Sequence, residues 1–147
     1  MRANRRAPVF SEGRITVSAS PGRLWDILAD FENWPSWSPD VTTVSLEGPV
    51  AEGTVFRWKA GPSRIVSTLR RVESPNVLAW TGRTTGVRAI HVWRFEPSGE
   101  GAVASMEESF DGTVARLLRK RLQRQLDEST TKGLEALKAA AERPTAG

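Results

Sequence analysis

The stretch DFENWPSWSPDV, which is Asp30–Val41, is the connection from which the fold can be worked out. It places two tryptophans and two prolines within twelve residues. Proline fixes φ and biases the preceding residue toward an extended conformation, so this stretch has room for only one helical turn, around Asn33–Ser36. Each indole can bury about 150–250 Å², which makes two exposed indoles costly. We expect a stiff connection that folds back over an apolar core, anchored by Trp34 and Trp37.

The residues before this stretch predict a strand followed by a short helix. Arg14–Ala19 alternates polar and apolar residues, which is typical of a half-buried strand. Ser20 and Pro21 form a helix-start signal, with the serine as N-cap and the proline in the first helical position. Leu24–Leu28 supplies the apolar face of that helix. Residues 1–9 are basic and poor in apolar residues, so we expect them to be a disordered tail.

After the Trp/Pro stretch, the chain has the pattern of six short strands separated by turn residues. Glycine, proline, serine and asparagine recur between the apolar runs at the spacing of antiparallel hairpins. Together with the first strand, this predicts an antiparallel meander of about seven strands. The six expected strands are Val41–Leu46, Thr54–Lys59, Arg64–Val72, Val77–Arg83, Arg88–Phe95 and Ala102–Phe110.

The last part of the chain predicts one long amphipathic helix. No proline occurs between Thr113 and Arg143, and Pro144 then ends the helix, leaving residues 144–147 as a short tail. We expect about 28 helical residues, or about 42 Å, which must lie across the sheet to bury an apolar stripe. The stripe consists of Val114, Leu118, Leu122, Leu126, Gly133, Leu137 and Ala141.

This order of elements resembles the START-like superfamily, also called SRPBCC, and within it the polyketide cyclase/dehydrase and lipid-transport branch. The resemblance covers residues 13–142 and implies an α+β helix-grip fold. In that fold a curved antiparallel sheet of about seven strands (β-α-α-β6-α) wraps the long C-terminal helix around an internal apolar cavity. We therefore expect residues 10–143 to form a single domain. The segments that carry the resemblance are Ile15–Pro21, Leu24–Leu28, Asp30–Trp37, Gly53–Trp58, Glu73–Leu78 and Val92–Pro97.

Counting residues across the hairpins predicts which side chains face inward. If the Ser98–Gly101 loop pairs Pro97 with Ala102, then His91 lies opposite Glu108. The inward positions Leu69 and Val72 differ in parity, which predicts a bulge between them. Trp34 and Trp37 are expected at the cavity mouth as a lid or its anchors. The expected ligand-binding residues are Phe56, Trp58, Ile65, Ser67, Trp80, His91, Trp93, Met106 and Glu108 of the sheet, with Leu122 and Leu126 of the helix.

His91 and Glu108 are the two titratable residues expected on the inner face. A buried charge needs a partner, so their pairing is chemically coherent. The pair could anchor a hydroxyl or carbonyl of a ligand, or act as a catalytic acid and base. The other interpretation, which we favour, is a structural pair that helps to fix the strand register.

Composition excludes several classes of site. The absence of cysteine and the single histidine leave no conventional metal site, and we expect no metal. The glycines of Thr81–Gly86 lie in a hairpin and not before a helix, so we expect no nucleotide or other cofactor. The basic cluster Arg116–Arg124 is interpreted as a solvated helix face, and the net charge of +4 is spread along the chain, which does not indicate nucleic-acid binding. No apolar run is long enough to span a bilayer, so we expect a cytoplasmic protein, as a monomer or weak homodimer.

Three functions are compatible with these patterns. We favour binding, with or without transport, of a small hydrophobic, lipid-like or aromatic molecule in the internal cavity. The alternative is a polyketide cyclase or aromatase that uses His91 as an acid or base. The third is a non-catalytic interaction module whose core is filled by the tryptophans. The fold does not choose among them.

Overall fold

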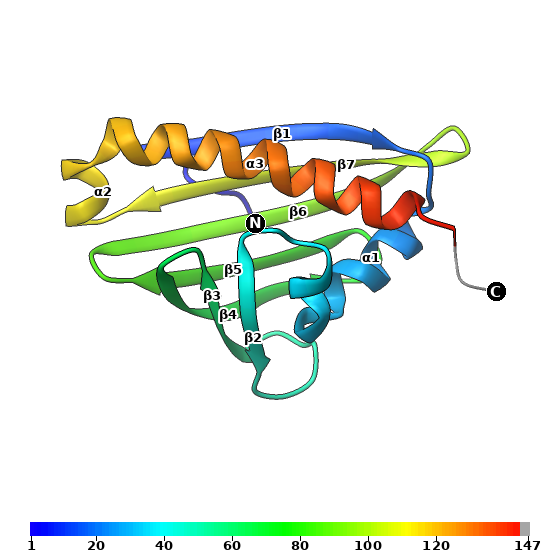
Figure 1. The fold of residues 1–147 in the computed structure, drawn as a ribbon, viewed down its shortest axis with the longest axis horizontal. Coiled ribbons are helices and arrows are strands. Elements are labelled where there is room, and N and C mark those ends of the chain that lie inside the picture. Colours follow the sequence, from blue (N-terminus) through cyan, green and yellow to red (C-terminus); the bar gives the residue numbers. More distant parts are fainter. Residues whose placement is uncertain (145–147) are drawn as a thin grey trace.

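The structure, a computed structural model, describes residues 1–144. Its centre is one curved antiparallel sheet of seven strands in the order β1-β7-β6-β5-β4-β3-β2 (Figure 1). All neighbours except β1 and β7 are consecutive in the sequence, as the expected meander requires. The strands are β1 (Val9–Val17), β2 (Val41–Leu46), β3 (Val55–Ala60), β4 (Ser63–Glu73), β5 (Val77–Thr84), β6 (Val87–Ser98) and β7 (Gly101–Asp111).

The helices confirm the predicted helix-grip fold. The long helix α3 (Arg119–Glu142) lies along β1 and β7, and α1 (Pro21–Ala29) packs near its C-terminal end (Figure 1). The side chain of Ser20 caps α1 by accepting a hydrogen bond from the Arg23 N–H, as expected. None of the helices within residues 1–144 has the length and apolarity needed to cross a membrane.

The long helix is not continuous as predicted, because it breaks at Leu118. A separate short helix, α2 (Thr113–Leu117), precedes α3. The Val114 N–H donates to the Gly86 carbonyl at 3.1 Å, which ties α2 to the turn between β5 and β6. Since α3 instead follows β1 and β7, the chain changes direction at Leu118 (Figure 1). Leu118, expected in the apolar stripe, is consequently 43% exposed.

The predicted strand register is confirmed at the hairpins that were counted. Pro97 pairs with Ala102, and this places His91 opposite Glu108. The register of β4 against β5 shifts between Leu69 and Arg71, within the interval where a bulge was expected. Inward and outward parity along the sheet could therefore be worked out from turn positions alone.

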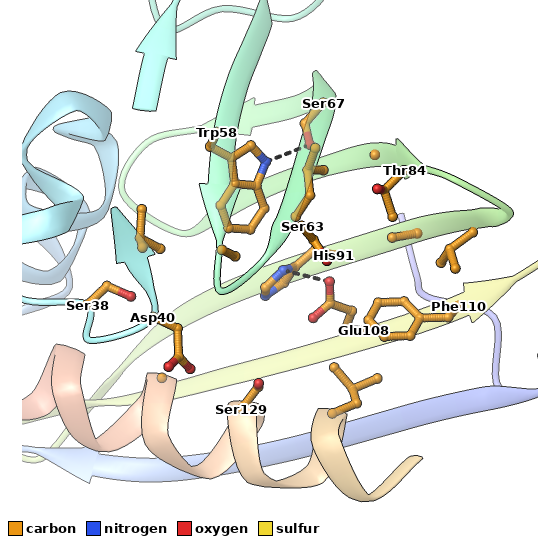
Figure 2. A pocket seen from close by; sticks show the side chains of 18 of the residues that line it. Ser38, Asp40, Trp58, Ser63, Ser67, Thr84, His91, Glu108, Phe110 and Ser129 are labelled. Carbon is orange, nitrogen blue, oxygen red and sulfur yellow. Dashed lines mark hydrogen bonds and ion pairs between the residues drawn. The ribbon is translucent and has the colours of Figure 1, made fainter. Parts of the chain in front are cut away.

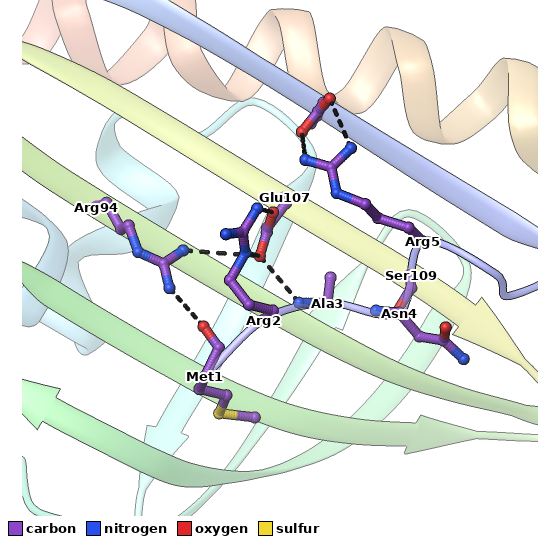
Figure 3. Close-up of polar contacts among 9 residues, drawn as sticks. Met1, Arg2, Ala3, Asn4, Arg5, Arg94, Glu107 and Ser109 are labelled. Atoms are coloured by element: carbon purple, nitrogen blue, oxygen red, sulfur yellow. Dashed lines mark hydrogen bonds and ion pairs between the residues drawn. The ribbon is translucent and has the colours of Figure 1, made fainter.

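The N-terminal residues differ from the expected disordered tail. Met1–Asn4 lie along the outer face of the sheet over β6 and β7 (Figure 3), and β1 starts at Val9, earlier than predicted. The Glu107 carboxylate accepts hydrogen bonds from Arg2 Nε at 2.9 Å and from the Ala3 N–H at 3.0 Å. Glu107 is only 5% exposed, and a buried carboxylate requires such partners. The segment is therefore ordered by polar contacts, which its lack of apolar residues does not reveal.

Electrostatics at Glu107 follow from these contacts. Burial by itself raises the pKa of the carboxyl group. The hydrogen bonds from Arg2 and Ala3, together with the charges of Arg2 and Arg94, outweigh burial, so the net pKa lies below its usual value. The ionised form of Glu107 therefore stabilises the folded state.

The Trp/Pro stretch forms a 3₁₀ helix, η1 (Phe31–Ser36), that covers one end of the sheet. The rings of Phe31 and Trp34 stack with centroids 4.7 Å apart, and Phe31 also contacts Phe56 at 4.9 Å. The Trp34 Nε1–H donates to the Leu28 carbonyl at 2.8 Å, near the end of α1. Trp34 is thus buried in the core, with its indole N–H bonded to the end of α1.

Candidate functional site

A pocket of about 720 Å³ lies between the sheet and α3 (Figure 2). Its walls come from the inward positions of β3 to β7 and from one face of α3. The connection after η1, residues 37–41, and the turns at 60–64 and 82–87 complete its rim. The antiparallel meander brings these distant segments together around one space.

Aromatic side chains form much of the wall on the sheet side. Trp58, Trp80 and Trp93 occupy inward positions on β3, β5 and β6. Met106 lies opposite Trp93 on β7 and extends the apolar surface. Three indoles around one space provide flat, polarizable faces that suit a hydrophobic or aromatic molecule.

His91 and Glu108 place polar atoms on this apolar wall (Figure 2). His91 Nδ1 lies 3.2 Å from Glu108 Oε2, although the two groups are not aligned for a hydrogen bond. Neither ring nitrogen of His91 has a hydrogen-bond partner among the described residues, and His91 is 8% exposed. The ring is held between Trp80, with centroids 4.7 Å apart, and Trp93, with centroids 5.8 Å apart. The pair can offer a donor and an acceptor to a bound molecule, or move a proton.

Ser67 orients an indole and is not a free hydroxyl. The Trp58 Nε1–H donates to Ser67 Oγ at 3.0 Å (Figure 2). Gly82 lies directly opposite Ser67 on β5. A Cβ on Gly82 would stand 2.7 Å from Ser67 Oγ, closer than side-chain atoms approach. The glycine therefore leaves the space in which the Ser67 hydroxyl holds Trp58 against the pocket.

The two tryptophans of the Trp/Pro stretch have different roles at the pocket. Both line it, but Trp34 is 4% exposed and its N–H is already bonded to the Leu28 carbonyl. The buried Trp37 Nε1 has no hydrogen-bond partner among the described residues. Ser38 and Asp40 follow it on the rim (Figure 2). Trp37 is thus the member of the pair whose indole N–H has no hydrogen-bond partner among the described residues.

Most of the residues predicted to bind a ligand do line the pocket. Phe56 is the exception: it is 0% exposed and packs against Phe31, Trp34 and Trp80 in the core. Its inward parity was right, but η1 covers this end of the sheet and separates it from the pocket. The predicted residues found on the wall are Trp34, Trp37, Trp58, Ile65, Ser67, Trp80, His91, Trp93, Met106, Glu108, Leu122 and Leu126.

Several lining residues were missed. Phe110 follows Glu108 by two residues and shares its inward parity, so the strand pattern was sufficient to include it. Ser129 lies seven residues after Leu122 on the same helical face, which was also a usable signal. Ser63 and Thr84 are terminal residues of β4 and β5 that lie just outside the predicted strands, whereas Asp40 lies in a turn, where the sequence carries no comparable periodicity. Among the described residues, no group of three His, Cys, Asp or Glu side chains could hold a metal ion.

Comparisons with known proteins agree with this architecture. Residues 10–142 match the family described as polyketide cyclase/dehydrase and lipid transport. No curated protein sequence matches the chain. Solved structures with the same fold include the hypothetical protein jhp0584 from Helicobacter pylori, at 16% identity and a TM-score of 0.83, with 94% of this chain and 90% of that one covered.

Two further structures carry more informative descriptions. A START superfamily protein from Mycobacterium smegmatis has a TM-score of 0.78 at 13% identity, and the match covers 90% of this chain and 97% of the other. The Zhui aromatase/cyclase from Streptomyces sp. R1128 has a TM-score of 0.75 at 20% identity, with 94% and 97% covered. At these identities the similarity establishes the fold alone.

Proposed function

The chain belongs to the polyketide cyclase/dehydrase and lipid-transport family, and from that premise we propose that it binds a small hydrophobic molecule in the pocket between the sheet and α3. One observation carries the proposal: a space of about 720 Å³ has aromatic walls and contains an imidazole whose two nitrogens lack partners. Pockets for small molecules commonly measure about 300–1,000 Å³. The size of the space argues against a module whose core is filled by tryptophans.

The pocket chemistry supports an aromatic or lipid-like ligand with one polar end. Apolar contact with Trp58, Trp80 and Trp93 supplies affinity at about 25 cal/mol per Å² of surface removed from water. A hydroxyl or carbonyl near His91 and Glu108 would satisfy polar atoms that otherwise have no aligned partner. The aromatic walls thus provide the affinity, and the polar pair orients the ligand.

Native mass spectrometry of the freshly purified protein tests this proposal. We expect an additional mass that disappears after extraction with organic solvent, and saturable rebinding of the extracted compound. A pocket-filling variant, Gly133→Phe, should lose this binding, because a side chain there points toward Met106. The matched control is Thr131→Phe, on the exposed face of the same helix. The polypeptide mass alone, with no saturable uptake of aromatic or fatty-acid probes, would refute ligand binding.

A second candidate function is cyclisation or aromatisation of a polyketide-like chain. His91 and Glu108, side by side on the pocket wall, favour it because they could transfer a proton to a chain held in a folded conformation. The variant His91→Ala separates the two candidates. A binding protein should lose about 1–3 kcal/mol of affinity. An enzyme should keep binding and lose turnover by about 10²–10⁴-fold.

A further inference from the structure

The corner between α2 and α3 exposes two consecutive leucines. Leu117 is 83% exposed and Leu118 is 43% exposed, and they are the large hydrophobic side chains found exposed within residues 1–144. A single exposed leucine is ordinary, but two adjacent ones at a turn form a small apolar patch. The backbone geometry exposes both leucines: the helix breaks at Leu118, and Ala115 on the other side of α2 is fully buried.

The same corner is strongly basic. Arg119, Lys120, Arg121 and Arg124 are all exposed, and none forms an ion pair with another described residue. Arg116 contacts Asp111 at 3.6 Å, and no acidic residue occurs between Gly112 and Leu126. Four exposed cations without an ion-pair partner among the described residues therefore follow the two leucines in the first turns of α3.

This apolar and basic corner adjoins one end of the pocket. Val114 on one side of the leucines and Leu122 on the other both line the pocket. The turn after β5 contributes Thr84 and Thr85 to the same rim, and the Val114 N–H is bonded to Gly86 within that turn. Whatever covers the corner lies next to an edge of the ligand space.

We propose that this corner docks on an anionic lipid surface, with Leu117 and Leu118 in the headgroup region and the basic side chains on lipid phosphates. Such a surface offers an apolar layer and negative charge within a few ångströms of each other, which matches both features of the corner. A two-fold symmetric dimer through the corner would bring its cations against one another. A nucleic acid would use the cations and leave the leucines in water. The proposal goes beyond ligand binding and does not depend on it.

Cosedimentation of the full chain with vesicles tests the proposal. We expect binding to phosphatidylcholine vesicles that contain phosphatidylglycerol, weaker binding as salt is raised, and little binding to phosphatidylcholine alone. The variant L117S/L118S should weaken partition at least about tenfold, because leucine burial in the interface is lost. The variant R119E/K120E should weaken it at least about tenfold by reversing two charges.

The control must carry the same change in charge at another place. R14E/R70E reverses two exposed arginines on β1 and β4, away from the corner, and should bind as the wild type does. Absence of binding to anionic vesicles at low salt would overturn the proposal, as would equal losses in R119E/K120E and in the control. Binding of duplex DNA that L117S/L118S leaves unchanged, without vesicle binding, would assign the corner to nucleic acid. A dimer in sedimentation velocity that L117S/L118S dissociates, again without vesicle binding, would assign it to self-association.

Discussion

The contact between Gly82 and Ser67 sets the position of one pocket wall, and Gly82→Ala perturbs it directly. The new Cβ would stand 2.7 Å from Ser67 Oγ and 3.3 Å from Ile65 Cγ2. Ser67 is 1% exposed, so its hydroxyl has little room to move aside. The substitution should therefore displace Ser67 and break the 3.0 Å hydrogen bond from Trp58 Nε1.

The magnitude follows from three opposing contributions. Overpacking in a close-packed site costs about 1–3 kcal/mol. Loss of the hydrogen bond to Trp58 adds about 1 kcal/mol. Replacing glycine within a strand returns about 0.5–1 kcal/mol. We expect Gly82→Ala to lower the free energy of unfolding by about 1–3 kcal/mol in total.

A double-mutant cycle measures this contact by chemical denaturation. Ser67→Ala alone should cost about 1 kcal/mol through the lost hydrogen bond. In the variant S67A/G82A the clashing hydroxyl is absent, so the second substitution should cost little. The coupling energy should be about 1–3 kcal/mol, with the double variant more stable than the sum of the single effects predicts. Additive effects would refute the close approach of Gly82 to Ser67.

Three further predictions concern the N-terminal tie, the aromatic anchor and the imidazole. The pKa of Glu107 is lowered in the folded state, so its stabilising effect is present above the usual value of 4.5 and is lost as pH falls through the lower folded pKa. Glu107→Gln should remove this acid dependence of stability from denaturation curves. An unchanged pH profile of stability in that variant would contradict the role of the Glu107 carboxylate. Trp34→Phe removes the bond to the Leu28 carbonyl and should lower the free energy of unfolding by about 1–3 kcal/mol, measured in the same way; no change would count against its anchoring role. His91→Phe removes an imidazole whose nitrogens make no aligned hydrogen bond, but it also leaves the Glu108 carboxylate, 3.2 Å away, without its neighbour. The double variant H91F/E108Q removes both polar groups and should leave thermal stability equal or higher, so a large loss in it would show that the His91–Glu108 pair is structural.

The strand register is the part of the site that could be predicted from sequence. Side chains alternate strictly along a strand, and short turns at Ser98–Gly101 and Thr84–Val87 fix the pairing between neighbours. Two local features, turn position and parity, therefore placed His91 opposite Glu108 and both on the inner face. The capped start of α1 was predictable for a similar reason, since Ser20 and Pro21 act within one helical turn.

Contacts between segments far apart in the chain escaped this reasoning. Phe56 has the parity of a wall residue, yet η1 closes over it, and only the packing of Phe31 and Trp34 shows this. The helix pattern does not reveal the break at Leu118, because its cause is a bond to Gly86 in a turn nearly thirty residues away.

The opening Trp/Pro stretch shows the same division. Its prolines and indoles by themselves determined a short, stiff connection buried over an apolar core, because proline geometry and indole burial are local properties. Only the tertiary structure decided that Trp34 donates to Leu28 in the core while the Trp37 N–H lacks a partner beside the pocket. Likewise, only the fold decided that residues 1–4 pack on the sheet, since Glu107 supplies the partner from more than a hundred residues away. Local chemistry sets what a segment can form, and long-range contacts set which of its groups remain available for function.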